Sequence, residues 1–166
     1  MKSLQILNAS NGCGINQKGI EGLNLIELSA NDNSKITNIS HMKSLQILDA
    51  FGNNCGINQK GIEGLNLIQL DADYNSKITN VSYMKSLQIL YASGSCGINQ
   101  KGIEGLNLIK LHASNNSKIT NVSHMKSLQI LNASISCGIN QKGIEGLNLI
   151  KLDANFNSKI TNNNKV

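Results

Sequence analysis

The chain has 166 residues, of which 40% are hydrophobic, and its formal net charge of +5 owes its positive part entirely to lysine, since arginine is absent. This apolar content is enough for one folded domain with a core, and it excludes a disordered chain. No stretch approaches the roughly 18 apolar residues of a membrane span, and the N-terminus lacks the apolar run of a signal peptide. The expectation is therefore an intracellular, cytoplasmic protein that does not enter a membrane.

The first segment of the chain, MKSLQIL, begins at Met1 and recurs at Met42, Met84 and Met125, with spacings of 41, 42 and 41 residues. A second segment, CGINQKGIEGLNLI, also occurs four times without any change, first at Cys13–Ile26. Self-similarity at a fixed period is the mark of a repeat architecture. The sequence therefore predicts one domain over residues 1–166, built from double units 1–41, 42–83, 84–124 and 125–166, with no separate capping domains.

Each unit divides again into two similar halves. Leu4–Ser10 and Leu25–Asn31 both follow the pattern Leu-x-x-Leu-x-Ala, so the elementary repeat has 20 to 22 residues and there are eight of them. Within a repeat, the alternation of Leu28 and Ala30 predicts a short strand with one buried face. A single repeat cannot bury its apolar stripe alone, so the repeats must stack on one another and place their strands in one parallel sheet.

The second half of each unit extends this pattern as Leu25-x-x-Leu28-x-Ala30-x-x-Asn33, followed by isoleucine or methionine at every third residue. This spacing suits an irregular or 3₁₀-like return path. The pattern resembles the leucine-rich repeat family, and most closely its short, internalin-like class. The resemblance implies an α/β-type repeat solenoid, an arc with a parallel sheet on its concave face and 3₁₀ or irregular segments on its convex face. Two departures stand out, because alanine replaces the third strand leucine and alternate repeats carry a cysteine just beyond the asparagine position.

Several recurring residues are expected to be structural. The amide of Asn33 and its equivalents at 75, 116 and 157 can satisfy backbone groups that the turn leaves unpaired. Gly14, Gly19 and Gly22, with their equivalents, are expected to form turns. Equivalent cysteines lie two repeats apart, ~9–10 Å from one another, which is too far for a disulfide. No Cys/His cluster suggests a zinc site, so buried free thiols in a reducing compartment are expected, with no metal and no cofactor.

The four units differ almost only on one side of the strand. In Leu25–Asp32 the inward residues are constant among the units, whereas Glu27, Ser29 and the residues at the strand exit vary. All five aromatic side chains and all three histidines lie in variable columns, and aromatic side chains anchor protein interfaces. The residues predicted to form a ligand-binding concave face are Asn8, Glu27, Ser29, Asp32, Asp49, Phe51, Gln69, Asp71, Asp73, Tyr74, Tyr91, Lys110, His112, Asn132, Lys151, Asp153 and Phe156.

This pattern predicts a non-enzymatic scaffold that recognises a protein or peptide. The face changes from acidic to basic along the chain, which favours a ligand of opposite polarity in one orientation. Neutral drift after duplication would also concentrate change at outward positions, but it should reach the exposed return path as well. There Asn16, Gln17, Lys18 and Glu21 are identical in every unit. A designed scaffold would show the same pattern.

Other functions remain open at this point. The terminal repeats lack obvious polar caps, so a self-associating structural protein that forms a homo-oligomer, or a fragment of a longer array, is the main alternative. The acidic group Asp49, Asp71 and Asp73 is more consistent with surface acidity than with a Ca²⁺ site. No carboxylate–histidine–nucleophile set is implied, which argues against an enzyme. The absence of arginine argues against nucleic acid, although the lysines at 35, 77, 118 and 159 could attract phosphate weakly.

Overall fold

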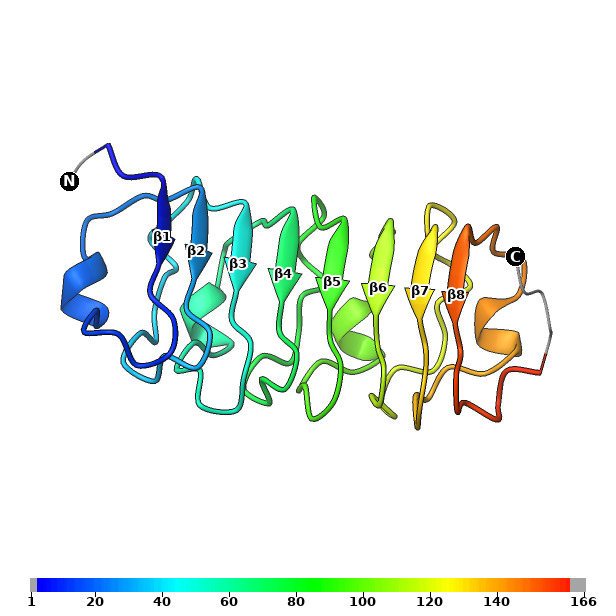
Figure 1. Cartoon of the computed structure of the whole chain (residues 1–166). Helices are drawn as coiled ribbons and strands as arrows, with labels where there is room; N and C mark the ends of the chain where they lie inside the picture. Colours follow the sequence, from blue (N-terminus) through cyan, green and yellow to red (C-terminus); the bar gives the residue numbers. More distant parts are fainter. Residues whose placement is uncertain (1–2, 162–166) are drawn as a thin grey trace.

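The computed structural model describes residues 3–161 as a solenoid in which the chain winds through eight coils (Figure 1). Each coil contributes one three-residue strand to a single parallel sheet, whose spatial order is the order along the chain. The strands are β1 (Ile6–Asn8), β2 (Glu27–Ser29), β3 (Ile47–Asp49), β4 (Gln69–Asp71), β5 (Ile89–Tyr91), β6 (Lys110–His112), β7 (Ile130–Asn132) and β8 (Lys151–Asp153). We number the coils by their strands. The predicted repeat solenoid with a parallel sheet is confirmed.

The return paths are of two kinds, and they alternate. Odd coils carry a short 3₁₀ helix behind the sheet: η1 (Gln17–Ile20), η2 (Lys60–Ile62), η3 (Lys101–Ile103) and η4 (Lys142–Ile144). The described residues of the even coils form no helix there; in coils 2, 4 and 6 the isoleucine, valine and methionine side chains at every third position are buried along an irregular path. The sequence predicted an irregular or 3₁₀-like path in the even coils; in the described residues that path is irregular, and the 3₁₀ turns lie in the odd coils. An N-cap contributes, since the Asn16 side chain accepts a hydrogen bond from the N–H of Gly19.

The core is a column of constant side chains that runs the length of the solenoid. Leu28 of β2 pairs with Leu48 of β3, Leu48 pairs with Leu70 of β4, and all three are buried. The alanines that directly follow β1 to β7, from Ala9 to Ala133, are fully buried as well. A leucine layer beside an alanine layer lets successive coils approach at the spacing of paired strands, so each coil buries its apolar stripe only against its neighbours.

The junction from an odd coil to the following even coil depends on two side-chain amides. Asn116 Nδ2 donates to the carbonyl oxygens of Ala92 (2.7 Å) and Ile98 (3.1 Å) in the previous coil, and Asn116 Oδ1 accepts from the Lys118 N–H. The buried residues at 33, 75 and 157 repeat this arrangement. The structural role predicted for these asparagines is confirmed.

On the return path of the same junction, a glutamine of the odd coil holds the even coil. Gln100 Oε1 accepts hydrogen bonds from the backbone N–H groups of Thr120 and Asn121, each at 2.9 Å, and Gln100 Nε2 donates to the Asn121 carbonyl. Gln17 and Gln59 make the same contacts with their own following coils. The constancy of this exposed-looking residue therefore has a structural cause.

The junction from an even coil to the next odd coil depends on the absence of side chains. A Cβ atom at Gly97 would lie 2.5 Å from the carbonyl oxygens of both Ser76 and Ile78 in the previous coil. A Cβ atom at Gly56 or Gly138 would lie equally close to two carbonyl oxygens. At Gly61, Gly102 or Gly143 it would lie too close to the carbonyl oxygen of a threonine. The Gly19 column lies inside the short 3₁₀ turns, as predicted, and at positions 61, 102 and 143 its glycine also allows close packing. The prediction for the Gly14 column needs correction, because Gly56, Gly97 and Gly138 have no positive φ and serve close packing instead. The Gly22 column turns the chain as predicted, with φ near +70°.

Every coil passes through a left-handed residue just after its strand. Asn11, Asp32 and Asn115 tolerate this conformation, and glycine occupies it at positions 52 and 94. Ile135 adopts it with φ of 60°, which is strained for a β-branched side chain.

Replacing Ile135 by asparagine is expected to raise the free energy of unfolding by about 1 kcal/mol, because it relieves this strain at a partly exposed position. Urea denaturation followed by circular dichroism measures the change. The matched control is Asn115→Ile, which puts the same side chain into an equivalent turn with φ of 56°. It should lose a similar amount, and equal stabilities for all three chains would contradict the explanation.

Candidate functional site

The outward side chains of the eight strands form two parallel columns, which together we call the sheet face. The first column continues through all eight strands in register as Asn8, Ser29, Asp49, Asp71, Tyr91, His112, Asn132 and Asp153. The second column alternates constant isoleucines with variable residues: Ile6, Glu27, Ile47, Gln69, Ile89, Lys110, Ile130 and Lys151. Most residues that differ between units therefore gather on one continuous surface, whereas His41, Tyr83 and His124 lie on the return path.

The predicted site residues divide into two groups. Those within the strands lie on the sheet face itself. The others follow the strands, in the turns at the strand-end edge of the sheet: Asp32, Phe51, Asp73, Tyr74 and Phe156. Among these turn residues, Phe156 is 93% exposed, whereas Phe51 and Tyr74 pack against each other with ring centroids 5.6 Å apart. The turns thus extend the candidate surface beyond the edge of the sheet.

The centre of the sheet face carries a cluster of three side chains from β5 and β6. The rings of Tyr91 and His112 lie edge to face, with centroids 4.7 Å apart. Lys110 Nζ donates a hydrogen bond to Tyr91 Oη at 2.9 Å and lies 4.9 Å from the centre of that ring. Burial lowers the pKa of His112, and the positive charge of Lys110 lowers it further. The imidazole is therefore neutral at pH 7, and the cluster presents a rigid aromatic surface beside one cation.

The neighbouring strands carry an acidic cluster. Ser29 Oγ donates to Asp49 Oδ2 at 2.8 Å, and the backbone N–H of Phe51 donates to Asp49 Oδ1. Asp71 lies next to Asp49 on the adjacent strand and accepts a hydrogen bond from the Asp73 N–H at 2.9 Å. Burial also raises the pKa of the Asp73 carboxyl. The acidic and aromatic clusters touch, since Asp71 pairs with Tyr91 in register.

Burial raises the pKa of Asp71 from 3.8 to about 6; the hydrogen bond from Asp73 N–H opposes this, and the charges of Asp73 and Asp49 add to it. Because the folded state holds this proton more tightly than the unfolded state, wild-type stability should fall as pH rises from about 4 to about 6. Asp71→Asn removes the ionisation and keeps the acceptor. It should be more stable than the wild type by about 1 kcal/mol near pH 8, after allowance for solvent screening, and should lose this advantage near pH 3.5. Urea denaturation at both pH values measures this; a difference independent of pH would contradict it.

The structure describes no arrangement suited to a metal ion, because no group of three or more His, Cys, Asp or Glu side chains in residues 3–161 could hold one. The four cysteines are free; those at 55, 96 and 137 are buried, and Cys13 is partly buried. Burial raises the pKa of the Cys55 thiol to about 11 and that of Cys96 to about 12. These thiols are packing groups rather than nucleophiles.

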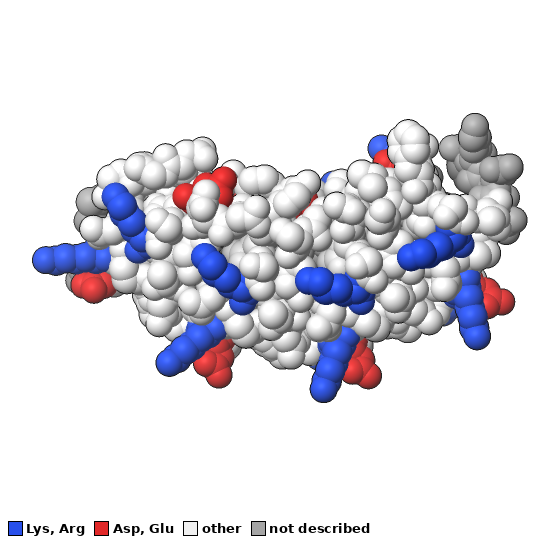
Figure 2. Space-filling model, turned by 90° about the horizontal axis from the view of Figure 1, so that it is seen from below, with Lys and Arg blue, Asp and Glu red and all other residues white. Residues whose placement is uncertain are grey.

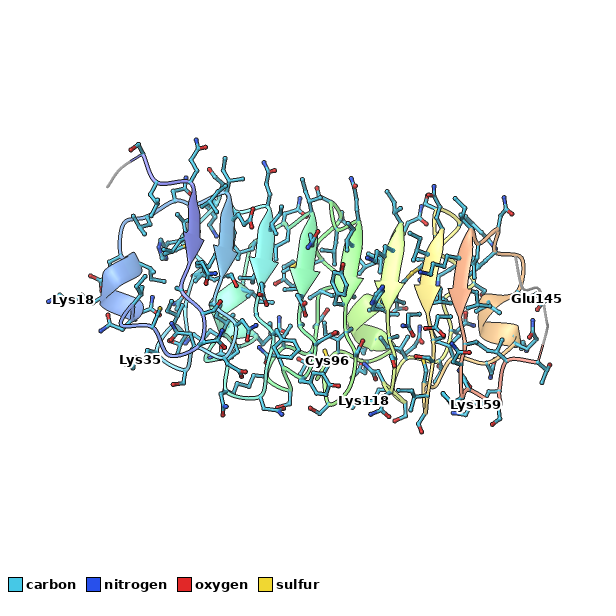
Figure 3. All side chains as sticks on the ribbon, in the orientation of Figure 1. Lys18, Lys35, Cys96, Lys118, Glu145 and Lys159 are labelled. Atoms are coloured by element: carbon cyan, nitrogen blue, oxygen red, sulfur yellow. The ribbon has the colours of Figure 1, made fainter. Side chains whose placement is uncertain are left out.

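Two rows of lysines are visible from the strand-end edge of the sheet (Figure 2). Figure 2, seen from the strand-end edge, shows one row without acidic neighbours and a second row, behind the sheet, where each lysine lies beside an acidic side chain. Figure 3 places Lys35, Lys118 and Lys159 along the strand-end edge. Lys118 Nζ donates to the Cys96 carbonyl at 2.7 Å, and Lys77 makes the equivalent bond at 2.6 Å. These lysines therefore have a structural role besides their charge.

The constant return path needs a revised interpretation. Neutral drift would be expected to change exposed residues such as Asn16 and Gln17, but both make structural hydrogen bonds. Their constancy therefore says nothing about ligand binding. The contrast with the variable face now depends on exposed residues such as Lys18 and Glu21, which are identical among the units.

A hollow at the strand-start edge was missed by the sequence comparison. It has a volume of about 1100 Å³ and is lined by constant residues, including Gln46, Ile68, Gln88 and Ile109. A comparison of variable positions could not find this hollow, because every residue that lines it is identical at the equivalent positions of the other units. The sequence signal for this hollow is that glutamine precedes each odd strand and isoleucine precedes each even strand, so the two residue types alternate along this edge.

No helix in residues 3–161 is long and apolar enough to cross a membrane. No family model matches the chain, and neither a curated protein nor a solved structure matches it.

Proposed function

We propose that this chain is a non-enzymatic recognition scaffold that binds an extended segment of a protein or peptide on its sheet face. One observation carries the proposal. Side chains that differ between otherwise identical units form an uninterrupted column across all eight strands, on one face of one sheet. The constant residues build the junctions between coils, so the variable ones are free to define a binding surface.

We further propose that the chain is a leucine-rich repeat protein, with an α/β-type arc whose sheet face is concave. The repeat length of 20 to 22 residues, the Leu-x-x-Leu-x-Ala strand and the asparagine at the strand exit support this assignment. The buried asparagine ladder and the 3₁₀ turns behind the sheet are consistent with it. Burial of free thiols supports a reducing, cytoplasmic location.

The chemistry of the sheet face suggests a ligand class. Tyr91 and His112 form an aromatic platform, the Asp49–Asp71 pair gives one side a negative potential, and Lys110 gives the other a positive one. A ligand with an apolar or aromatic residue between a basic and an acidic segment would match all three. Neither a cofactor nor nucleic acid is part of the proposal, since Lys110 and Lys151 are the only lysine side chains in the two strand columns and no arginine is present.

The proposal is tested by selecting binders from a displayed library of random peptides on the immobilised chain. Enriched peptides should share a fixed order of basic, aromatic and acidic residues. Their affinity should fall roughly tenfold or more for Tyr91→Ala, because loss of an aromatic anchor removes contact area at the centre of the surface. The matched control replaces Lys101 and Glu104 by alanine behind the sheet and should bind as the wild type does. Peptides that bind Tyr91→Ala and the wild type equally well would contradict the proposal.

A further inference from the structure

The two ends of the solenoid present the two halves of a junction that already occurs inside the molecule. Even-to-odd junctions join β2 to β3, β4 to β5, and β6 to β7. The described sheet begins with an odd coil, at β1, and ends with an even coil, at β8 (Figure 1). The outer side of coil 8 therefore corresponds to the even half of this junction, and the outer side of coil 1 to its odd half.

The outer side of coil 1 has a glycine, Gly14, at the position where inner odd coils have a close-packed glycine, although no described atom confines it. Gly56, Gly97 and Gly138 are each confined by two carbonyl oxygens of the previous even coil. Gly14 occupies the same place in coil 1, but a Cβ atom there would meet no atom within 4 Å. The glycine that lets an even coil dock is thus present on a side that no coil within residues 3–161 occupies.

The outer side of coil 1 is also apolar. The side chain of Ile6 is 62% exposed, and Leu4, Leu7 and Ile15 pack against the core while remaining only partly buried. The equivalents of Leu4, Leu7 and Ile15 in coil 3 are Leu45, Leu48 and Ile57, and each of these is at most 2% exposed. A docked coil would restore this burial.

The outer side of coil 8 offers the complementary groups. In each inner even coil, the N–H of the strand alanine donates to the next coil, as Ala72 does to Tyr91 O at 2.9 Å and Ala113 to Asn132 O at 2.8 Å. Ala154 holds the same place in coil 8, and its N–H has no acceptor in the described part of the chain. Ile150, which is 66% exposed, adds apolar surface. Unpaired donors beside exposed apolar groups at a sheet edge favour strand pairing.

We propose that copies of this chain stack head to tail, with coil 8 of one copy docked on coil 1 of the next and the parallel sheet continued across the interface. The register of the β2–β3 junction places Lys151 opposite Ile6, Leu152 opposite Leu7 and Asp153 opposite Asn8 of the next copy. The interface is heterologous and does not close, so the assembly grows with concentration. Because each copy has a net charge of +5, added salt screens the repulsion and favours growth.

The test is sedimentation velocity on the full 166-residue chain across a wide range of concentrations. The weight-average mass is expected to rise continuously from 17.9 kDa to more than twice that value, and to rise further with salt. A mass that stays at 17.9 kDa at all concentrations overturns the proposal, and so does growth that stops at a closed dimer.

Two variants locate the interface. Ile6→Lys places a cation opposite Lys151 of the next copy, where like charges oppose pairing, while within its own chain it lies beside Glu27. It should remain folded by circular dichroism and lose most of the mass increase. Adding Lys151→Glu should restore growth, a result that a folding defect could not produce. Growth that survives Ile6→Lys, or that is lost instead with Tyr91→Ala on the sheet face, overturns the proposal.

Discussion

A Gly97→Ala variant is expected to lose about 3 kcal/mol of its free energy of unfolding, because one methyl group enters a space that backbone atoms already fill. The new carbon would lie 2.5 Å from two carbonyl oxygens of coil 4, those of Ser76 and Ile78. Neither oxygen can move alone, since both belong to a backbone fixed by its own junctions. Coils 4 and 5 must therefore separate, and the cost spreads over the hydrogen bonds and the leucine contacts between them. Urea denaturation followed by circular dichroism gives the difference.

Gly14→Ala is the matched control for this prediction. It makes the same chemical change in the same local sequence, at a position where a Cβ atom meets nothing within 4 Å. The variant should stay within about 0.5 kcal/mol of the wild type or gain slightly, because alanine restricts the unfolded chain more than glycine does. If both variants lost the same stability, the cost would come from the local conformation of the glycine and not from packing between coils.

Asn116→Ala is expected to cost on the order of 3 to 5 kcal/mol, because it leaves two buried carbonyl oxygens and one partly buried N–H without partners. The carbonyl oxygens of Ala92 and Ile98 would lose their donor, and the Lys118 N–H would lose its acceptor. Alanine is too small to fill the space, and a water would have to replace all three bonds at once. The same denaturation measurement applies, and hydrogen exchange should show faster opening at the junction of coils 5 and 6.

Two further substitutions separate the hydrogen bonds from the side-chain volume. Asn116→Asp has almost the same size but, when ionised, directs a carboxylate at two carbonyl oxygens. It should be at least as damaging as alanine at pH 7 and should recover in acid, where the protonated carboxyl can donate. Asn155→Ala removes an exposed asparagine and should change stability by less than about 0.5 kcal/mol. A fully stable Asn116→Asp variant at pH 7 would show that the amide donor is not needed.

These two predictions concern the two junctions that alternate along the solenoid, and together they explain why fourteen residues are identical in every unit. The constant segment Cys96–Ile109 contains the close-packing glycines at 97 and 102, the clamping Gln100 and the turn residue Gly105. The part of this segment in coil 5 packs against coil 4 on one side and against coil 6 on the other. A change at Gly97, Gly102 or Gln100 alters the packing or hydrogen bonds between coils, whereas a change at an outward strand position leaves these backbone contacts in place.

The repeat could be predicted from the sequence because each structural role in a coil is filled by one residue type at a fixed spacing. Leu28 and Ala30 recur at strand spacing, so the parallel sheet and its register followed directly, including the neighbours of Tyr91 and His112. Asn33 recurs where a turn leaves the backbone unpaired, which gave its structural role. Periodic patterns of this kind survive because every coil meets the same local environment.

Part of the candidate site was also readable. The alternation of inward and outward residues predicts that Asp49, Asp71 and Tyr91 share one column, which the strand register confirms. The contacts within that column were not predictable, since the stacking of Phe51 on Tyr74 depends on side-chain rotamers and turn geometry.

What the sequence by itself determined is the order of the strands and the identity of the side chains that face outward, since both follow from period alone. What only the tertiary structure decided is why the constant residues are constant. Gly97 resembles a turn glycine in the sequence but has no positive φ and is confined by the carbonyl oxygens of another coil. Gln100 resembles a solvent-exposed residue but clamps the backbone of the next coil. Both roles join residues about 20 positions apart, and they exist only once the coils have stacked.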